Sequence, residues 1–500
     1  MIKRFIARLL GNKPGTPRLK RIPVSRHGLS RVQIAPCALK VTDTLQQHGY
    51  LAFVVGGAVR DLLLDKTPKD FDVATNATPE QVHALFRRSH LIGRRFRLVH
   101  VLCGNETIEV STFRASSNAE GSSANEISNE VFETETGHEV RLTNEDTLSD
   151  PHLDDEPIQP GSRTRRTRRK PEHSHTQTTD ETGRIVRDNI FGSQASDAER
   201  RDFTVNALYY DPSSEEIFDY CGGLEDIRNK TMRIIGDAAT RYREDPVRML
   251  RAARFAAKLD FSIDAAARAP IPELAGLLEN VPSARLFDEM LKLLLSGHAV
   301  RAIHQLRAEG LHQGVLPMLD TMLENEYSHR FVMAALNNTD QRIQTGKTVS
   351  PAFLFASLLW YEVKAQHGRR CEAGEDSTPA MYNAMHDALD QQRERLAIPR
   401  RLDGTMKEIW AIQPRFNQRT GIRALRLLAH PRFRAGYDFL LLRAQAGEIE
   451  QDLAEWWTQF QTADDVLRTE MIENLAPLPQ KKRRKRKKPA NTTVPGTIDA

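Results

Sequence analysis

The amino-acid sequence predicts an α+β fold, in which a small mixed β-sheet with its helices is followed by a helical second half. Between residues 50 and 113, short apolar or alternating segments take turns with segments of helical periodicity, as in a sheet covered by helices. From Pro246 onward, apolar residues recur at helical spacing and no strong strand pattern follows. Residues 115–182 and 471–500 are polar or basic without either periodicity, which indicates disorder.

Composition sets the general class of the protein. A length of 500 residues suggests roughly two to four domains, and 40% hydrophobic residues suffice for real cores. The net charge of +5 is nearly balanced, and the four cysteines are far apart, which argues against a disulfide framework or a Cys-rich zinc site and favours a reducing cytoplasm. No stretch approaches the roughly 18 apolar residues of a membrane span, so we expect no transmembrane segment.

In the first half, the segments can be assigned in order. Residues 1–35 are expected to form a basic N-terminal arm with an extended lead-in, and Met1–Leu10 either frays or lies on an anionic membrane. Thr78 followed by Pro79 is a helix N-cap signal. The alternation near residue 110 places Glu109 and Ser111 on one face of a strand. The expected helices are 41–50, a short Leu-rich segment after residue 57, and 79–88. The expected strands are 50–55, 69–73, 96–103 and 107–113.

The remaining boundaries follow from changes in composition. We expect residues 36–236 to form one domain that contains the 115–182 insertion, with a helix start at Arg200–Leu208 and short strands at 217–220 and 232–235. Two helical domains, 237–300 and 301–470, and a basic tail, 471–500, complete the division. Lys481–Lys488 is an unbroken basic run that would bind a polyanion. The expected later helices are 283–297, 299–309, 351–363, 378–394, 404–413, 421–429, 435–446 and 448–460.

Two neighbouring motifs carry the clearest chemistry. Gly56 and Gly57 end the apolar strand, and glycines there allow backbone N–H groups to approach a phosphate closely. Asp70 and Asp72 are two residues apart, so on a strand they point to one face, where a hard cation such as Mg²⁺ would relieve their repulsion. A pair of aspartates alone is weak evidence, but next to the glycine turn it predicts phosphoryl or nucleotidyl transfer.

Further charged residues have both a structural and a functional interpretation. Arg60 either pairs with Asp61 at the end of a short helix or faces a phosphate, and it can do both. Arg201 and Asp202 lie either in a charged first helical turn or at the same site, as a phosphate ligand and a third carboxylate. Glu109 competes with Asp202 for the role of third carboxylate, and the sequence does not decide between them.

A second charged cluster begins at residue 241. Asp245 and Arg248 are three residues apart, and on one helix they form either a surface salt bridge or a carboxylate–guanidinium pair that reads a base edge. Arg251, three residues further, could reach a triphosphate. His386–Asp387 suggests a phosphohydrolase dyad, but no other ligand set surrounds it, so a charged helix surface is expected there.

Together these segments resemble the class II nucleotidyltransferase family of the polymerase β-like superfamily, which includes bacterial CCA-adding enzymes and bacterial poly(A) polymerases. The matching segments, in family order, are GGAVRDLLL, KDFDVAT, IEVSTFR, RRDFTVNALYY, FDYCGGLEDI and RYREDPVRMLRAARFAAKL. Within the family the chain is similar to the poly(A) polymerase branch, on LIGRRFRLVHV, IPVSRHGLSR, DNIFGS, PAFLFASLLWY, LAIPRRL, LLAHPRFRAGYDFLLLRA and the basic C-terminus. Residues 116–180 depart from the family pattern.

The resemblance implies a nucleotidyltransferase head, a nucleotide-recognition neck at 237–300, and a helical body with an RNA-binding region. It implies that Asp70 and Asp72 hold two Mg²⁺ ions and that Asp202 is the further active-site carboxylate. Residues implied to bind the nucleotide are Gly56, Gly57, Arg60, Arg201, Arg248 and Arg251, and Asp245 would join Arg248 in recognising the base.

The activity implied is template-independent transfer of AMP from ATP to RNA 3′ ends in the cytoplasm, with pyrophosphate release. The same resemblance implies that the protein promotes RNA turnover and has the RNA-degradation machinery as a partner. The alternatives are a CCA-adding tRNA nucleotidyltransferase and a non-enzymatic RNA-binding adaptor. The presence of both aspartates, Asp70 and Asp72, argues against the adaptor.

Overall fold

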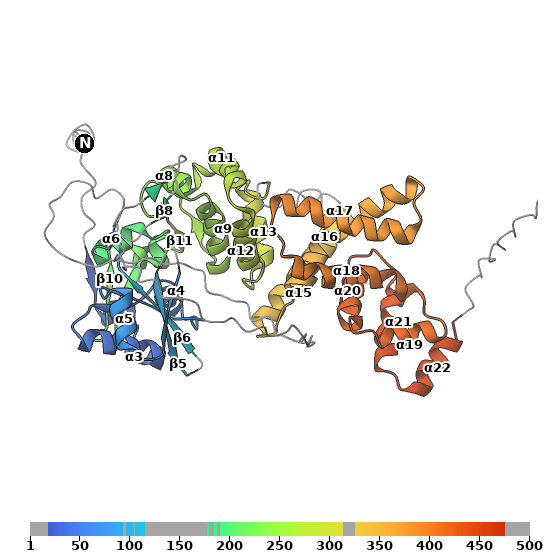
Figure 1. The fold of residues 1–500 in the computed structure, drawn as a ribbon, viewed down its shortest axis with the longest axis horizontal. Coiled ribbons are helices and arrows are strands. Elements are labelled where there is room, and N and C mark those ends of the chain that lie inside the picture. Colours follow the sequence, from blue (N-terminus) through green and yellow to red (C-terminus); the bar gives the residue numbers. More distant parts are fainter. Residues whose placement is uncertain are drawn as a thin grey trace, which may run out of the picture. The chain divides into compact units, whose positions relative to one another are not determined.

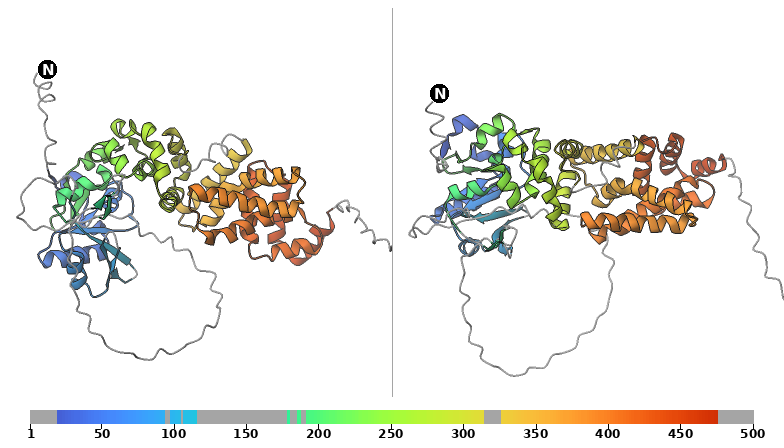
Figure 2. Two further views of the ribbon diagram at one scale, coloured as in Figure 1. Left: turned by 45° about the horizontal axis from the view of Figure 1, so that its top comes forward. Right: turned by 90° about the horizontal axis from the view of Figure 1, so that it is seen from above.

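The structure, a computed structural model, describes residues 19–93, 97–104, 106–115, 178–179, 185–187, 191–313 and 326–475. It contains two compact units (Figures 1 and 2): Met1–Glu324 with Leu336–Pro351 and Leu389–Pro399, and Asn325–Ala335 with Ala352–Ala388 and Arg400–Ala500. The Met1–Leu10 arm, most of the 115–182 insertion and the basic run Lys481–Lys488 lie outside the described residues. The predicted domain boundaries therefore stay predictions.

An eight-stranded mixed sheet forms the centre of the first unit, which confirms the predicted fold class. Its strand order is β1-β10-β9-β2-β3-β6-β5-β4, and in this order only β3 and β6 pair in parallel. The strands are β1 (Lys20–Ile22), β2 (Ala52–Val55), β3 (Asp72–Thr75), β4 (Ser89–Ile92), β5 (Leu98–Cys103), β6 (Glu106–Thr112), β9 (Leu208–Asp211) and β10 (Glu216–Asp219). Two small separate sheets pair β7 (Thr178–Thr179) with β8 (Ile185–Arg187), and β11 (Thr231–Met232) with β12 (Ser262–Ile263).

Helices cover both sides of this sheet. Helix α3 (Pro36–Gln47) packs on β2, β3 and β6, while α5 (Pro79–Leu85) packs on β4, β5 and β6. On the face that carries Phe53, Val55 and Tyr209, the apolar core also takes in Ala198 of α6 (Gln194–Arg200). Figure 1 shows the sheet between helices α3 and α5, drawn in blue, and helix α6, drawn in green. Burying apolar surface on both faces stabilises the sheet.

The local signals for α5 act as the sequence predicts. The Thr78 hydroxyl accepts a hydrogen bond from the Gln81 backbone N–H, and the Gln81 side chain accepts one from the Thr78 N–H. This reciprocal capping box satisfies two N–H groups that a helix start otherwise leaves unpaired. Pro79 occupies the first turn, where its missing N–H costs nothing.

The N-terminal lead-in differs from the expectation. Of the residues expected as an extended arm, Lys20–Ile22 form β1, which pairs with β10 at the edge of the sheet. Helix α2 (Val24–His27) and a 3₁₀ turn (Arg31–Gln33) follow. The His27 ring and the Arg31 N–H both bond to Glu215, which fastens this segment to the loop between β9 and β10. Sequence reasoning missed it because three-residue strands carry almost no periodic signal.

Helices complete the first unit beyond the sheet. Helix α9 (Val247–Leu259) is almost wholly buried and packs against α12 (Ser283–Leu294) and α13 (Ala299–Ala308). The other α-helices among the described residues of this unit are α4 (Gly57–Leu63), α7 (Gly223–Arg228), α8 (Ala238–Glu244), α10 (Ala265–Arg268) and α11 (Ile271–Leu274). Helices α15 (Glu326–Gln344) and α17 (Ser377–Arg395) contribute residues to both units.

The described part of the second unit is helical throughout, as predicted. Its remaining helices are α16 (Pro351–Glu372), α18 (Asp403–Ile412), α19 (Ile422–Leu428), α20 (Phe433–Gln445), α21 (Gln451–Thr462) and α22 (Asp465–Glu473). The indole N–H groups of the buried Trp410 and Trp457 donate to the carbonyl oxygens of Ala356 and Phe416, so these large side chains leave no polar group unpaired. Across the residues that the structure describes, no helix has the length and apolarity needed to cross a membrane.

A second glycine pair, Gly222 and Gly223, packs against the turn that follows α6. The Asp219 carboxylate accepts hydrogen bonds from the four successive backbone N–H groups of residues 221–224. Gly222 has φ +83°, and a Cβ atom on Gly223 would lie 2.1 Å from the carbonyl oxygen of Thr204. Thr204 begins the 3₁₀ helix η2 (Thr204–Asn206), so the glycine allows close contact between α7 and this turn.

We predict that Gly223→Ala lowers the free energy of unfolding by about 3 kcal/mol, because backbone atoms must move to admit the methyl group. Thermal or urea unfolding of the full chain measures this loss. Gly276→Ala is the matched control, since its Cβ would meet nothing within 4 Å and its φ is not positive. Equal stability of the Gly223 and Gly276 variants would contradict the close approach.

Candidate active site

The first glycine pair forms the strand-to-helix turn that the sequence predicts. Strand β2 ends at Val55, and Gly56, with φ 68° and ψ −128°, is the N-cap of α4. This backbone conformation is accessible to glycine and strained for other residues. The Gly56 N–H donates to the carbonyl of Leu208 on β9, which fixes the turn against the sheet. Gly57 opens the helix, where N–H groups lack intrahelical partners and suit an anion.

The two aspartates lie beside this turn. Asp72, the first residue of β3, is directly opposite Val55, the last residue of β2 before the glycines. Asp70 precedes the strand, so only one of the two aspartates lies on it, although both were expected there. Asp70 is exposed and Asp72 is half-buried, which leaves the carboxylates within reach of a ligand. The predicted neighbourhood of glycine turn and carboxylates is thus present.

Glu109 stands on the strand next to Asp72. The parallel pairing of β3 with β6 sets Asp72 directly opposite Glu109. Directly opposed residues on neighbouring strands point to the same face, with Cβ atoms about 5 Å apart. Of the two candidates that the sequence left open, Glu109 is the one that the sheet register sets directly opposite Asp72.

These acidic residues fit a divalent cation that arrives with a ligand. Carboxylate oxygens are the donors that Mg²⁺ prefers. Asp72 and Glu109 supply them from two adjacent strands, and Asp70 supplies them from the segment just before β3. Over the residues that the structure describes, no three His, Cys, Asp or Glu side chains gather closely enough to hold a metal by themselves. Mg²⁺ sites are commonly completed by phosphate oxygens and water, so an incomplete protein cage is what such a site requires.

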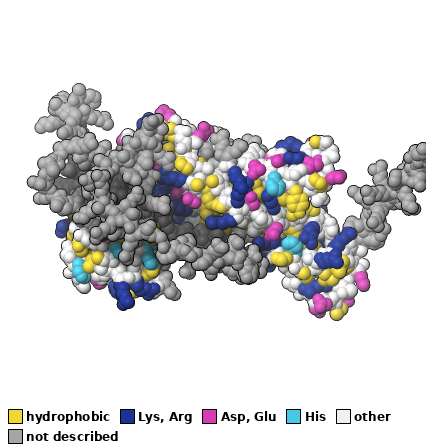
Figure 3. All heavy atoms as spheres, in the orientation of Figure 1, with side chains coloured by type: hydrophobic (Ala, Val, Ile, Leu, Met, Phe, Trp, Pro, Cys, Tyr) yellow, Lys and Arg dark blue, Asp and Glu magenta, His cyan; other side chains and the backbone are white. Residues whose placement is uncertain are grey.

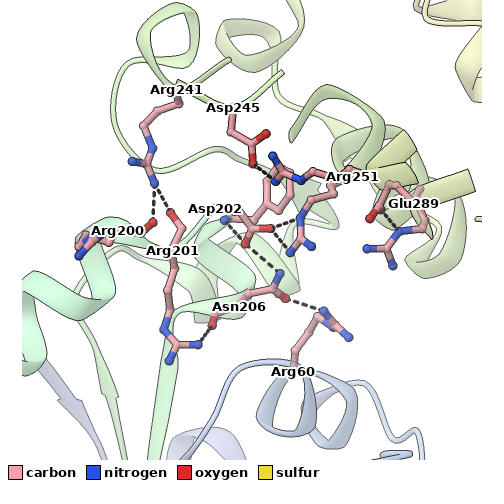
Figure 4. Close-up of polar contacts among 12 residues, drawn as sticks. Arg60, Arg200, Arg201, Asp202, Asn206, Arg241, Asp245, Arg251 and Glu289 are labelled. Atoms are coloured by element: carbon pink, nitrogen blue, oxygen red, sulfur yellow. Dashed lines mark hydrogen bonds and ion pairs between the residues drawn. The ribbon is translucent and has the colours of Figure 1, made fainter. Parts of the chain in front are cut away.

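Asp202 belongs to a different set of contacts, which Figure 4 shows. Its Oδ2 atom accepts hydrogen bonds from Nη2 and Nε of Arg251, at 2.6 and 2.9 Å. Its Oδ1 atom accepts from the Phe203 N–H and from the Asn206 side-chain amide. The side chain of Asp202 is 9% exposed and that of Arg251 16%. This ion pair joins the turn after α6 to helix α9.

The same network continues to the glycine turn. The Asn206 side-chain oxygen accepts a hydrogen bond of 2.5 Å from Nη1 of Arg60, which lies on α4 (Figure 4). Nε and Nη2 of Arg60 contact Asp61 at 2.8 and 2.7 Å, and the whole side chain is 3% exposed. Arg60 thus has a structural role, and its burial gives no support to the predicted phosphate contact. Sequence reasoning missed Asn206, although it lies four residues after Asp202 in the segment RRDFTVNALYY.

Phe255 of α9 packs beneath this network. The guanidinium carbons of Arg60, Arg251 and Arg254 lie 5.2, 5.5 and 4.2 Å from the centre of its ring. Cations over an aromatic face are attracted to it, so one ring supports arginines from α4 and α9. Arg254 is buried and pairs with the buried Glu289 of α12 at 2.5 Å, which continues the charge pairing into the helices.

The structure turns Arg201 away from Asp202. Its guanidinium donates to the Tyr209 hydroxyl at 3.1 Å, to Asp197 at 3.2 Å and to the Asn206 carbonyl at 3.2 Å. Tyr209 in turn donates to Asp197, and complete burial raises the pKa of this phenol well above its ordinary value. This cluster fastens α6 to β9, and the predicted contact between Arg201 and a triphosphate has no support in the geometry.

The Arg248 backbone N–H donates to the Asp245 carbonyl at 3.1 Å, but the side chains of these two residues bond to other partners, contrary to the expectation of a shared helix face. Asp245 ends α8 in an extended conformation, outside α9, and its Oδ2 accepts from Nη2 of Arg285 at 2.6 Å. Arg248 instead bonds to Glu244 and to the Arg241 carbonyl. Burial and the nearby Arg248 lower the pKa of Arg241 to about 10, and its Nη2 donates to the backbone oxygens of residues 200 and 201.

The His386–Asp387 pair on α17 has ordinary surface contacts, as expected. The exposed His386 ring lies 3.2 Å from the Lys407 ammonium, and Asp387 pairs with Arg370 at 2.5 Å. No feature of this pair indicates a phosphohydrolase site.

We predict that Asp202→Asn and Arg251→Gln each lower the free energy of unfolding by about 2–4 kcal/mol, because each leaves a partly buried charge without its partner. The double variant should lose less than the sum by at least about 1 kcal/mol, as measured by urea unfolding. The exposed pair of Glu326 and Arg330 on α15 provides the control cycle, with an expected coupling of about 0.5 kcal/mol or less. Simple additivity at Asp202 and Arg251 would refute the coupling.

Comparison with known proteins identifies the family of this chain. Residues 52–233 match the poly A polymerase head domain, residues 260–323 the probable RNA- and SrmB-binding site of polymerase A, and residues 373–490 the polymerase A arginine-rich C-terminus. Poly(A) polymerase I of Salmonella typhi is 43% identical to this chain, over 94% of this chain and 91% of that protein.

CCA-adding enzymes are more distant relatives. One from Geobacillus sp. (strain WCH70) is 34% identical, over 61% of this chain and 60% of that protein. The solved structure of a CCA-adding enzyme in apo form II is 16% identical with a TM-score of 0.54, and covers 92% of this chain and 89% of that one, so it shares the fold. The chain belongs to the poly(A) polymerase I family of nucleotidyltransferases.

Proposed function

We propose that this protein transfers AMP from ATP to the 3′-hydroxyl of RNA without a template and releases pyrophosphate. The observation that carries the proposal is the register that sets Asp72 beside the Gly56 turn and opposite Glu109. This arrangement provides a phosphate cradle and a cluster of hard oxygen donors at one place. Membership in the poly(A) polymerase I family supports AMP as the transferred group.

Nucleotidyltransferases of this family use divalent metal ions, and we propose Mg²⁺ held by Asp70 and Asp72. When bound, the ions would lower the pKa of the RNA 3′-hydroxyl and neutralise charge on the pyrophosphate. The chain itself would position the reactants: the N–H groups after Gly56 and Gly57 would face phosphate oxygens. Arg248 and Arg251, both partly exposed on α9, would donate to the polyphosphate or base. Asp245 would accept from the base amine.

The RNA partner is supported by the second unit as well as by the matched RNA-binding segment. Arg423 and Arg426 are exposed on α19, and Arg415 and Arg419 precede them. Figure 3 shows Lys and Arg side chains gathered on the part of this unit that carries α19 and α21. Such charges bind the phosphate backbone with little sequence preference and strong salt dependence. We further propose that the protein acts in RNA turnover in the cytoplasm, with the RNA-degradation machinery as a partner.

We predict that the full-length chain with ATP and Mg²⁺ extends a generic RNA into long tails, and that CTP gives no comparable product. Asp70→Ala and Asp72→Ala should each abolish AMP incorporation, because the donors for the cation are lost, while RNA binding remains within about threefold. Gel analysis of a labelled RNA primer measures the first, and filter binding the second.

Glu225→Ala serves as the control, since Glu225 is an exposed carboxylate on α7 of the same unit. It should extend RNA as well as the unaltered chain. Efficient use of CTP on tRNA ends would instead support the CCA-adding alternative. Full activity of the Asp72 variant would refute the proposed metal site, and no incorporation by the unaltered chain would favour the adaptor hypothesis.

A further prediction distinguishes the role of Glu109 from that of Asp202. Glu109→Gln keeps the shape of the side chain but removes a negative charge beside Asp72, so we expect kcat to fall by at least about 10²-fold with little loss of stability. Asp202→Asn should act mainly through stability and the KM for ATP, because Asp202 holds Arg251. Steady-state kinetics with thermal unfolding distinguishes the two patterns. The reverse outcome would restore Asp202 as the catalytic carboxylate.

A further inference from the structure

A row of side chains crosses the sheet at the level of Asp72. Val55, Asp72, Glu109, His100 and His90 are directly opposite one another on β2, β3, β6, β5 and β4. Directly opposed residues point to the same face, so all five side chains stand on one surface. The row changes from apolar to acidic to imidazole, which places a histidine one strand away from the carboxylate that faces Asp72.

His100 contacts that carboxylate. Its Nε2 atom lies 3.4 Å from Oε2 of Glu109, and the two side chains are 23% and 17% exposed. An ionised carboxylate only accepts hydrogen bonds, so Nε2 must carry the proton in this contact. His90, the next residue in the row, is exposed on β4, the last strand in the order of the sheet.

We propose that His100 is a positioning residue that holds the Glu109 carboxylate toward Asp72 for nucleotidyl transfer. The inference rests on the proposed function, because it assigns Glu109 to the reacting centre. A hydrogen bond at Oε2 would restrict rotation about the last bond of the Glu109 side chain and would leave Oε1 available to a ligand of Asp72. Loss of such a supporting donor typically lowers metal affinity or activity by about 10- to 100-fold.

Sheet stability alone gives a weaker reason for this histidine. The other residues of β5 on the same face are Leu98 and Leu102, so an apolar side chain at residue 100 would fit the strand pattern. A partly exposed ion pair contributes about 0–1 kcal/mol, which an apolar residue matches by burying its surface. A structural role therefore predicts that a leucine replaces His100 with no effect on catalysis.

The test compares His100→Ala, His100→Leu and His100→Gln with the unaltered full-length chain, with His90→Ala as the control from the same row. Gln keeps an amide N–H near the position of Nε2. Three quantities are measured: kcat and KM for ATP, Mn²⁺ affinity in the presence of ATP by electron paramagnetic resonance, and the temperature of unfolding. Asp72→Ala is included as the reference for the site itself.

We expect the Ala and Leu variants to lose about 10- to 100-fold in kcat and to bind Mn²⁺ several-fold more weakly, with KM for ATP within about threefold. The Leu variant should keep its unfolding temperature, and the Gln variant should recover most of the loss. His90→Ala should match the unaltered chain. Unchanged kcat and Mn²⁺ affinity in the Leu variant would overturn the proposal, and so would a Gln variant as impaired as Leu.

The reference separates two kinds of failure. If Asp72→Ala is inactive and His100→Leu is fully active, only the role of His100 is refuted. If Asp72→Ala is active, the proposed active site fails, and the role of His100 fails with it.

Discussion

The ion pair between Asp202 and Arg251 is the interaction on which the geometry of the site depends. It joins the turn after α6 to helix α9. A partly buried pair is tolerated only where hydrogen bonds satisfy the remaining lone pairs. Here the Phe203 N–H and the Asn206 side-chain amide donate hydrogen bonds to Oδ1 of the Asp202 carboxylate. The side-chain oxygen of Asn206 in turn accepts a hydrogen bond from Arg60, beside the glycine turn. The glycine turn, the Asp202 turn and α9 are therefore positioned together.

The sheet supplies the second constraint, because its register decides which carboxylates meet. Parallel pairing of β3 with β6 sets Asp72 opposite Glu109, and a shift by one residue would send Glu109 to the other face. The predicted alternation in residues 107–113 gave the face of Glu109 correctly, but it contains no information about which strand lies next to β6. That choice depends on contacts between residues far apart in the sequence, which a single sequence does not reveal.

Local signals explain what could be predicted. The helix start at Thr78 and the turn at Gly56 depend only on neighbouring residues, and both are where the sequence placed them. Strand β1 was missed because its three residues are too few for a periodic pattern. Strand β4 was missed although it has four residues, as many as the predicted β2 and β3. Asp245 and Arg248 were expected on one helix face, but Asp245 ends α8 in an extended conformation and pairs with Arg285, a residue of α12. Tertiary contacts decided these cases.

The arginines that the resemblance assigned to the triphosphate differ in how deeply they are buried. Arg60 is 3% exposed with all three guanidinium nitrogens bound within the protein, and Arg201 lies in the buried Asp197–Tyr209 cluster. Arg248 and Arg251 remain partly exposed, and both lie on α9. Each of these two arginines already bonds to a carboxylate in the folded protein. Much of the conformational entropy of the side chain is therefore lost when the chain folds, and less is lost when a ligand binds. We therefore propose that polyphosphate recognition depends on α9, and that Arg60 and Arg201 act by keeping the glycine turn and β9 in place.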